Sequence, residues 1–339
     1  MYKKMTLNQL YLSILILASL QSCTYNPLDV DASSIKVKTN FINLDSIFRS
    51  SDSSQLMNYH HKLQFEISEI YDYQLGYCLG LRTKSDTTFY NGIQQFLKDD
   101  YIKNVELEIS KQFKNLLQQK ENIIDGFRHL KFHLKDIKIP EHIVFMNSFF
   151  AANTFVTEKE IGIGLERYLG AKTQVIQQLP PDQFFEWMKA GLDKKYLERD
   201  ALCAWIMTHC VDEAKGNLAE HIIQWGKILY LTKAAFPEKT DAEILRYTDE
   251  DFTWAINNEA QVWEYLVKDK ILFKLNEQVI MNFIKEGPFT PGLPEEGPDR
   301  LGQFMGLRMI QKYMEIKKIS VAEMTKLSYT EILSEYEIE

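Results

Sequence analysis

The segment LAEHIIQWGKILYL, residues 218–231, places a glutamate beside a histidine in a stretch with a helical pattern of apolar residues. The metal-binding helix of a zinc peptidase needs two histidines at positions i and i+4, with a general-base glutamate beside the first. With His221 as the first histidine, the partner position holds Trp225, and with His221 as the second it holds Asn217. Neither side chain completes an imidazole pair. We therefore expect no catalytic residue and no cofactor.

Two further residues could supply ligands if the chain does bind a metal. His209 lies about 18 Å before His221 along any continuous helix, although Gly216 and Asn217 between them could let the chain fold back. Glu259 lies on the apolar stripe of a later helical pattern, where a zinc peptidase of this kind takes its third ligand. The candidate metal ligands are therefore His209, His221 and Glu259.

The segment 217–233 also carries a polar stripe on an otherwise apolar helix. Glu220, Gln224 and Lys227 share one edge of this helix, at i, i+4 and i+7. Buried polar groups must be hydrogen-bonded or line a cavity, and this spacing favours a ladder in which the three side chains bind one another. A carboxylate on an apolar stripe needs a cation, so we expect Arg300 to pair with Glu259 or Glu220. These five residues form the predicted buried polar cluster.

The elements that position these residues are mostly helical. Apolar residues recur at helical spacing over 54–75, 91–98, 101–134 (with a break near 122), 182–189, 195–207, 217–233, 249–267, 275–284, 300–316 and 320–334. Residues 143–146, 154–156 and 161–166 have the composition of short strands, and residues 35–38 alternate as an edge strand does. We predict an α+β fold that is predominantly α-helical, with a small antiparallel sheet packed on a zincin-like helical core.

The same pattern gives the domain boundaries. We assign residues 1–22 to a lipoprotein signal peptide, 23–41 to a tether, and 42–339 to one mostly helical domain. Within that domain we expect helices over 42–139, the sheet over 140–170, and helices again over 181–339.

The N-terminal segment predicts attachment to a membrane. Two lysines, Lys3 and Lys4, precede an apolar run from Leu10 to Leu20 that is too short to span a bilayer as a helix. The run ends in LQSC, residues 20–23, which has the form of a lipoprotein cleavage box. We therefore predict that Cys23 is lipidated and that its acyl chains anchor the protein without a membrane-spanning segment.

Charge and cysteine content narrow the possible partners. The chain has a net charge of −8, from 39 basic and 47 acidic residues spread along the sequence, so we expect no nucleic-acid partner. The other three cysteines, Cys78, Cys203 and Cys210, cannot all pair with each other, and none lies in a C-x-x-C motif. We interpret them as small buried hydrophobic residues.

A proline- and glycine-rich loop, residues 287–299, leads into the helical segment 300–316. Asp299 is a plausible N-cap for that helix. Gly302 and Gly306 lie within its first turns, where each glycine costs about 1 kcal/mol relative to alanine. We therefore expect these glycines to allow a close approach to a neighbouring backbone.

Taken together, several motifs resemble the family of the gliding motility lipoprotein GldB. They are the cleavage box, DVDASSIKVKTNFINLDSIF, IGIGLERYLG, IIQWGKILYL, RYTDEDFTWAINNEAQVWEYLV, GPFTPGLPEEGPDRLGQFMGLRMIQKYM and the terminal ILSEY. They extend over essentially the whole chain, and their order is more specific than any one of them. The sequence departs from the family pattern at Phe304 and Leu307, where tryptophan is expected.

This resemblance implies a cell-envelope lipoprotein required for the movement of surface adhesins in gliding bacteria and linked to type IX secretion. It implies a periplasm-facing protein, lipid-anchored to a membrane, with the outer membrane favoured, and other envelope proteins of the gliding machinery as partners. The family is distantly similar to predicted zinc proteases whose motif it has lost. Two hypotheses follow, a non-catalytic scaffold and, as the alternative, a zinc-dependent envelope hydrolase or peptidase with non-standard ligands.

Overall fold

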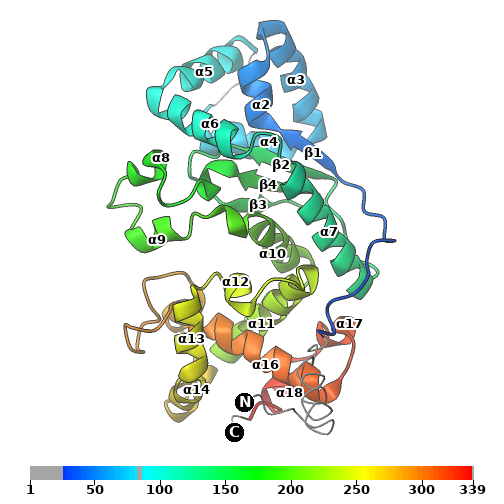
Figure 1. Ribbon diagram of the computed structural model, residues 1–339, viewed down its shortest axis with the longest axis vertical. Coiled ribbons are helices and arrows are strands. Elements are labelled where there is room, and N and C mark those ends of the chain that lie inside the picture. The colour runs from blue at the N-terminus through cyan, green and yellow to red at the C-terminus, as the bar shows by residue number, and fades with distance from the viewer. Residues whose placement is uncertain (1–25, 82–85, 338–339) are drawn as a thin grey trace, which may run out of the picture.

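The computed structural model describes residues 26–81 and 86–337, and Figure 1 shows their arrangement. The predicted signal peptide 1–22 and the lipidation site Cys23 lie outside these residues. Within them, no helix has the length and apolar character needed to cross a bilayer. The part of the predicted tether that is described is held against the fold, because Leu28 is buried and the Asn26 side chain donates to the Pro237 carbonyl oxygen at 3.1 Å.

A small mixed sheet lies in the middle of the molecule (Figure 1). Its strands, in spatial order, are β1 (Asn40–Asn43), β2 (His142–Met146), β4 (Glu160–Gly164) and β3 (Thr154–Val156). The pairs β1–β2 and β2–β4 are parallel, and only β3–β4 is antiparallel. The expected antiparallel sheet is therefore wrong, since a long helical crossover joins β1 to β2. The edge strand expected at 35–38 is also wrong, because β1 begins at Asn40.

The α+β class with mostly helical content is confirmed. The helices between β1 and β2 are α2 (Leu44–Ser50), α3 (Ser53–Glu66), α4 (Ser68–Asp72), the π-helix η1 (Tyr73–Cys78), α5 (Asp86–Lys98), α6 (Asp100–Gln112) and α7 (Leu117–His133). The helices after β4 are η2 (Leu165–Tyr168), α8 (Gln174–Gln177), α9 (Glu186–Ala190), η3 (Lys194–Tyr196), α10 (Leu197–His209), α11 (Leu218–Ala235), α12 (Asp241–Leu245), α13 (Asp249–Asn257), α14 (Glu259–Lys268), η4 (Ile271–Phe273), α15 (Glu277–Ile284), α16 (Leu301–Lys317), α17 (Val321–Met324) and α18 (Tyr329–Leu333). The break predicted near 122 lies instead between α6 and α7.

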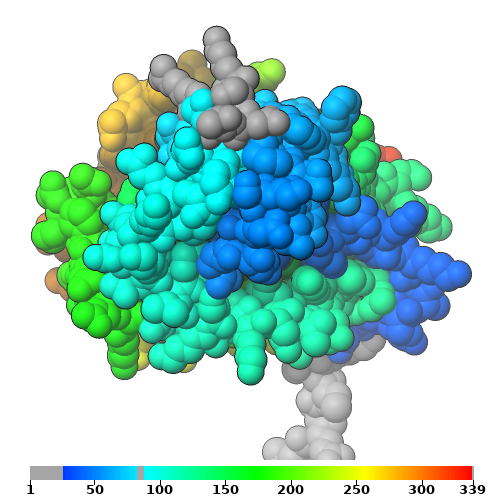
Figure 2. All heavy atoms as spheres, turned by 90° about the horizontal axis from the view of Figure 1, so that it is seen from above, coloured from blue at the N-terminus to red at the C-terminus, as the bar shows by residue number. Residues whose placement is uncertain are grey.

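The sheet separates two hydrophobic cores. Side chains alternate along β2, so Val144 and Met146 join one core while Ile143 and Phe145 join the other. The smaller core is covered by α2 to α5, whose blue and cyan atoms make up much of the face seen in Figure 2. The larger core extends from α6 and α7 to the C-terminal helices.

Helix α11 is the interior helix of the larger core, and α16 packs across it. The two helices approach so closely that a Cβ atom added to Gly306 would collide with the carbonyl oxygen of Ile222, and one added to Gly226 would collide with Gly306. At Gly302 an added Cβ would stand 2.8 Å from the carbonyl oxygen of Phe283. The close backbone approach predicted for Gly302 and Gly306 is therefore confirmed.

The three described cysteines are free thiols. Cys78 and Cys203 are buried, as expected, whereas Cys210 is half-buried.

Candidate functional site

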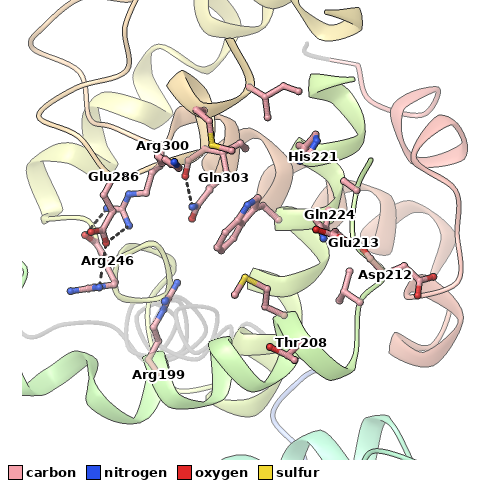
Figure 3. Close-up of a pocket in the computed structure, with 18 residues that line it drawn as sticks. Arg199, Thr208, Asp212, Glu213, His221, Gln224, Arg246, Glu286, Arg300 and Gln303 are labelled. Atoms are coloured by element: carbon pink, nitrogen blue, oxygen red, sulfur yellow. Dashed lines mark hydrogen bonds and ion pairs between the residues drawn. The ribbon is translucent and has the colours of Figure 1, made fainter. Parts of the chain in front are cut away.

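A cavity of about 860 Å³ opens between α10, α11, α15 and the start of α16 (Figure 3). Its walls include His221, Gln224 and Trp225 from α11, so the candidate metal ligand His221 does line a pocket. Arg300 lies at the opposite side, as Figure 3 shows. The cavity therefore brings together three of the residues considered in the sequence, His221, Gln224 and Arg300.

Three guanidinium groups gather at one end of this cavity. Arg199 Nη1 lies 3.1 Å from Asp200 Oδ1, and Arg246 Nη1 lies 3.4 Å from Asp200 Oδ2. Arg246 and Arg300 also face the same carboxylate, with Nη1 to Glu286 Oε1 distances of 3.3 and 3.7 Å (Figure 3). Such a group of nearly buried cations can bind an anion.

The backbone holds two of these arginines in an uncommon conformation. Arg246 follows α12 with φ 57°, and Arg300 precedes α16 with φ 52°, both in the left-handed region. A non-glycine residue there costs on the order of 1 kcal/mol and persists only when its surroundings fix it. The guanidinium of Arg246 lies 4.8 Å from the centre of the Tyr196 ring, and that of Arg300 lies 5.5 Å from the Tyr247 ring. These contacts fix both cations at the cavity.

The Asp299 carboxylate does not cap α16 as expected. It accepts a hydrogen bond from the Gly287 N–H at 2.9 Å and another from Arg300 Nε at 2.9 Å. It therefore closes the base of the loop 287–299 and positions Arg300. Arg300, and not Asp299, occupies the cap position before α16, and its side chain does not cap the helix.

The polar ladder predicted along α11 does not form. Glu220 accepts from the Lys215 N–H at 3.1 Å, and Gln224 donates to the Asp212 carbonyl oxygen at 3.0 Å. Lys227 is buried and donates to the carbonyl oxygens of Thr325 and Leu327. Glu220 and Gln224 bind the loop between α10 and α11, and Lys227 binds the segment between α17 and α18. Only tertiary packing determines where these segments lie.

The pairing predicted for Arg300 is also wrong. Glu259 is paired with Arg308, whose Nε lies 3.0 Å from Oε2, and it accepts from the Tyr336 hydroxyl at 2.6 Å. Arg308 lies two turns after Arg300, and Glu259 is the first residue of α14, which contacts α16. Glu259 and Lys227 therefore lie outside the cavity.

The three candidate metal ligands are engaged separately. The imidazole of His209 stacks on Trp205 at 3.7 Å between ring centres, and its Nε2 lies 3.2 Å from the Glu158 carbonyl oxygen. His221 faces the cavity, and Glu259 is held by Arg308. Across residues 26–81 and 86–337, no three side chains of His, Cys, Asp or Glu are grouped as a metal site requires. These residues do not fit zinc coordination.

A second group of polar side chains, missed in the sequence, lies at the carboxyl ends of the parallel strands. Asp45 follows β1, Asn147 and Ser148 follow β2, and Glu166 follows β4. The signal that could have identified them is a polar residue just after each strand, provided the strands were recognised as parallel. The Asn147 N–H donates to Asp45 Oδ1 at 2.6 Å, and the Asn147 side chain donates to Glu106 at 2.7 Å.

Burial and the neighbouring Glu106 carboxylate raise the pKa of Asp45 well above its usual range, and Glu166 raises it further. The backbone N–H of Asn147 and the Arg49 guanidinium act in the opposite direction. Within the described residues, Asp45 Oδ2 is buried without a hydrogen-bond partner. This atom is where a bound proton would reside.

The raised pKa of Asp45 predicts a pH dependence of stability. Between the unfolded value of 3.8 and the higher folded pKa, the folded chain holds a proton that the unfolded chain releases, so stability falls as pH rises through this window. Asp45→Asn should therefore raise the free energy of unfolding at pH 7.5 and reduce the difference between pH 5 and pH 7.5, as measured by urea unfolding. An Asp45→Asn protein that is less stable than the wild type at pH 7.5 would contradict this assignment. Asp31→Asn, at a fully exposed carboxylate, is the control and should not reduce that difference.

Comparison with known proteins gives one match. The family model described as gliding motility protein GldB matches residues 25–337, which is most of the chain. No curated protein and no solved structure matches the chain.

Proposed function

Because the chain belongs to the gliding motility protein GldB family, we propose that it is a non-catalytic, lipid-anchored component of the bacterial gliding machinery. The family match over residues 25–337 is the observation that carries this proposal. The match begins just after Cys23, so the proposed anchor directly precedes the family domain. We propose that the protein faces the periplasm from the outer membrane, where it would act on surface adhesin movement together with other envelope proteins and the type IX secretion system.

The non-catalytic role is supported by the chemistry of the cavity. Its imidazole, His221, is followed at i+4 by Trp225 and not by a second histidine. Its arginines are held by carboxylates and carbonyl oxygens, an arrangement suited to binding and not to activating water. We therefore propose a binding protein built on a fold in which a zinc-peptidase helix has lost its ligands. The alternative, a zinc hydrolase using His209, His221 and Glu259, would require those residues to move together.

Cys23→Ser should abolish lipid labelling and gliding. A serine hydroxyl at this position cannot form the proposed thioether to the lipid, so metabolic labelling with a palmitate analogue should fall to background. Spreading of colonies should be lost in a gliding host that carries this variant as its only copy. Cys78→Ser, at a buried free thiol, is the matched control and should retain labelling.

His221→Ala separates the two hypotheses in the same host. A scaffold should keep gliding in this variant, and the purified lipoprotein should contain no stoichiometric zinc. Zinc bound to the wild type and lost from His221→Ala, together with loss of gliding, would favour the hydrolase.

Labelling that persists in Cys23→Ser would contradict the proposed anchor.

A further inference from the structure

The carboxylate that joins the two arginines of the cavity is weakly held. The Glu286 side chain is 53% exposed, whereas those of Arg246 and Arg300 are each 10% exposed. Its contacts, at 3.3 and 3.7 Å, both involve Oε1. An ion pair in which one partner is this exposed contributes about 0–1 kcal/mol, so Glu286 can leave at little cost.

Without Glu286, the two arginines at the cavity would lack part of the negative charge that faces them. Arg199, Arg246 and Arg300 face two buried carboxylates, Asp200 and Asp299. Lys285 on the cavity wall and the neighbouring Arg167 add further positive charge, and burying unpaired cations is costly, so this end of the cavity requires negative charge. Glu286 supplies that charge from the half-exposed rim, and an incoming monoanion could replace it.

The remaining walls indicate what the anion is attached to. Apolar side chains line the cavity next to the arginines, and they include Trp225, Ile280, Ile284 and Met207, the last of which is 43% exposed. Amide and hydroxyl groups lie between them, from Gln224, Gln303 and Thr208. Each of the three donates to a backbone carbonyl oxygen, Gln224 to Asp212, Gln303 to Ile284 and Thr208 to Ala204. Their amide and hydroxyl oxygens can still accept from the N–H groups of a peptide, which a bare hydrocarbon chain lacks.

The end of the cavity opposite the arginines carries the opposite charge. Asp212 and Glu213 are exposed there, beside His221 and Gln224 (Figure 3). The cavity is thus positive at one end and negative at the other. Its volume of about 860 Å³ lies within the range of about 300–1,000 Å³ common for ligand pockets, and a short peptide would fit.

We propose that this cavity binds the C-terminal end of a peptide chain, with the terminal carboxylate replacing Glu286 between Arg246 and Arg300. The last side chain of the peptide is apolar and packs on Trp225 and Ile280, and a basic group two or three residues earlier lies near Asp212 and Glu213. As the partner-binding site of an adaptor, this inference rests on the proposed function. It is tested on the purified lipoprotein alone, so failure to bind a peptide would leave the labelling and gliding results unchanged.

The test measures binding of the tripeptide Lys-Ala-Leu to the full-length lipoprotein in detergent by isothermal titration calorimetry. The peptide with a free C-terminus should bind, and the same peptide with a C-terminal amide should bind about tenfold more weakly or not at all, because it lacks the charge-assisted hydrogen bonds. Octanoate, an acyl carboxylate of similar length, should bind more weakly than the peptide. Octanoate binding as tightly as the peptide would overturn the peptide assignment in favour of a fatty acid.

Removal of the Glu286 carboxylate tests the proposal more directly, because it should increase the affinity for the peptide. Glu286→Gln should bind the free tripeptide about threefold more tightly than the wild type, because the competing ion pair is gone. Glu295→Gln removes the same charge from an exposed position in the adjacent loop and should leave the affinity unchanged. A gain of affinity cannot arise from a misfolded protein. Equal binding of the amide, no binding to either protein, or unchanged or weaker binding by Glu286→Gln would each overturn the proposal.

Discussion

Gly306→Ala is expected to lower the free energy of unfolding by about 3 kcal/mol. The added Cβ would collide with the backbone carbonyl of Ile222 on α11, and the nitrogen of Gly226 lies only 2.9 Å from the same point. Both contacts involve backbone atoms, so no side-chain rotation can relieve them, and α16 must move away from α11. The intrinsic helix preference of alanine returns about 1 kcal/mol, which is too little to offset the separation of two interior helices.

The measurement is urea unfolding followed by circular dichroism. Gly226→Ala should behave similarly because it meets the same crossing from the other helix. Gly76→Ala is the matched control, since Gly76 lies in η1 and an added Cβ there has no neighbour within 4 Å, so this variant should not lower the free energy of unfolding. Gly306→Ala within 0.5 kcal/mol of the wild type, at about the spread of surface substitutions, would show that the crossing can adjust. Gly306→Ala should also weaken peptide binding, because α11 and the start of α16 form two walls of the cavity.

Glu166→Ala is expected to destabilise the protein by about 4 kcal/mol, since each buried donor that loses its acceptor costs about 1–3 kcal/mol. The Glu166 side chain is fully buried and accepts from the backbone N–H groups of Ser148 and Phe150, at 3.1 and 2.9 Å, and from the Ser148 hydroxyl. The turn it holds contains Phe149 and Phe150, two consecutive residues with φ of 54° and 61°. Without the carboxylate, the two backbone N–H groups have no acceptor, although the Ser148 hydroxyl can still donate to the Ala152 carbonyl oxygen, and the left-handed backbone loses its support.

Glu166→Gln distinguishes hydrogen bonding from charge. Burial raises the pKa of Glu166, and the hydrogen bonds from Ser148 and Phe150 partly offset this. Glutamine retains one acceptor oxygen, so it should cost about half as much as alanine. Equal losses in the two variants would mean that the negative charge itself stabilises the turn. A loss below 1 kcal/mol in Glu166→Ala would show that this turn does not depend on the carboxylate.

Local sequence information predicted the helical content of the chain and the positions of three strands. The periodicity of apolar residues identified α10, α11, α15 and α16, because helix formation depends on side chains three and four positions apart. The close approaches at Gly302 and Gly306 were also detectable, since glycine is costly within a helix and the packing of another backbone, from α15 at Gly302 and from α11 at Gly306, offsets that cost. The family match agrees with the motifs seen in the sequence.

Partners across the fold could not be predicted in the same way. Glu259 and Arg300 each needed an opposite charge, and the sequence showed this, but their partners are Arg308 for the first and Asp299 and Glu286 for the second. The prediction of antiparallel strand pairing was wrong for the same reason, because the path of the crossover helices determines whether strands run parallel. Composition and periodicity act over a few residues, whereas a salt bridge or a strand pair depends on where distant segments finally pack. The sequence alone therefore determined the need for a buried charge partner, and only the tertiary structure decided which residue meets that need and that three arginines share one cavity.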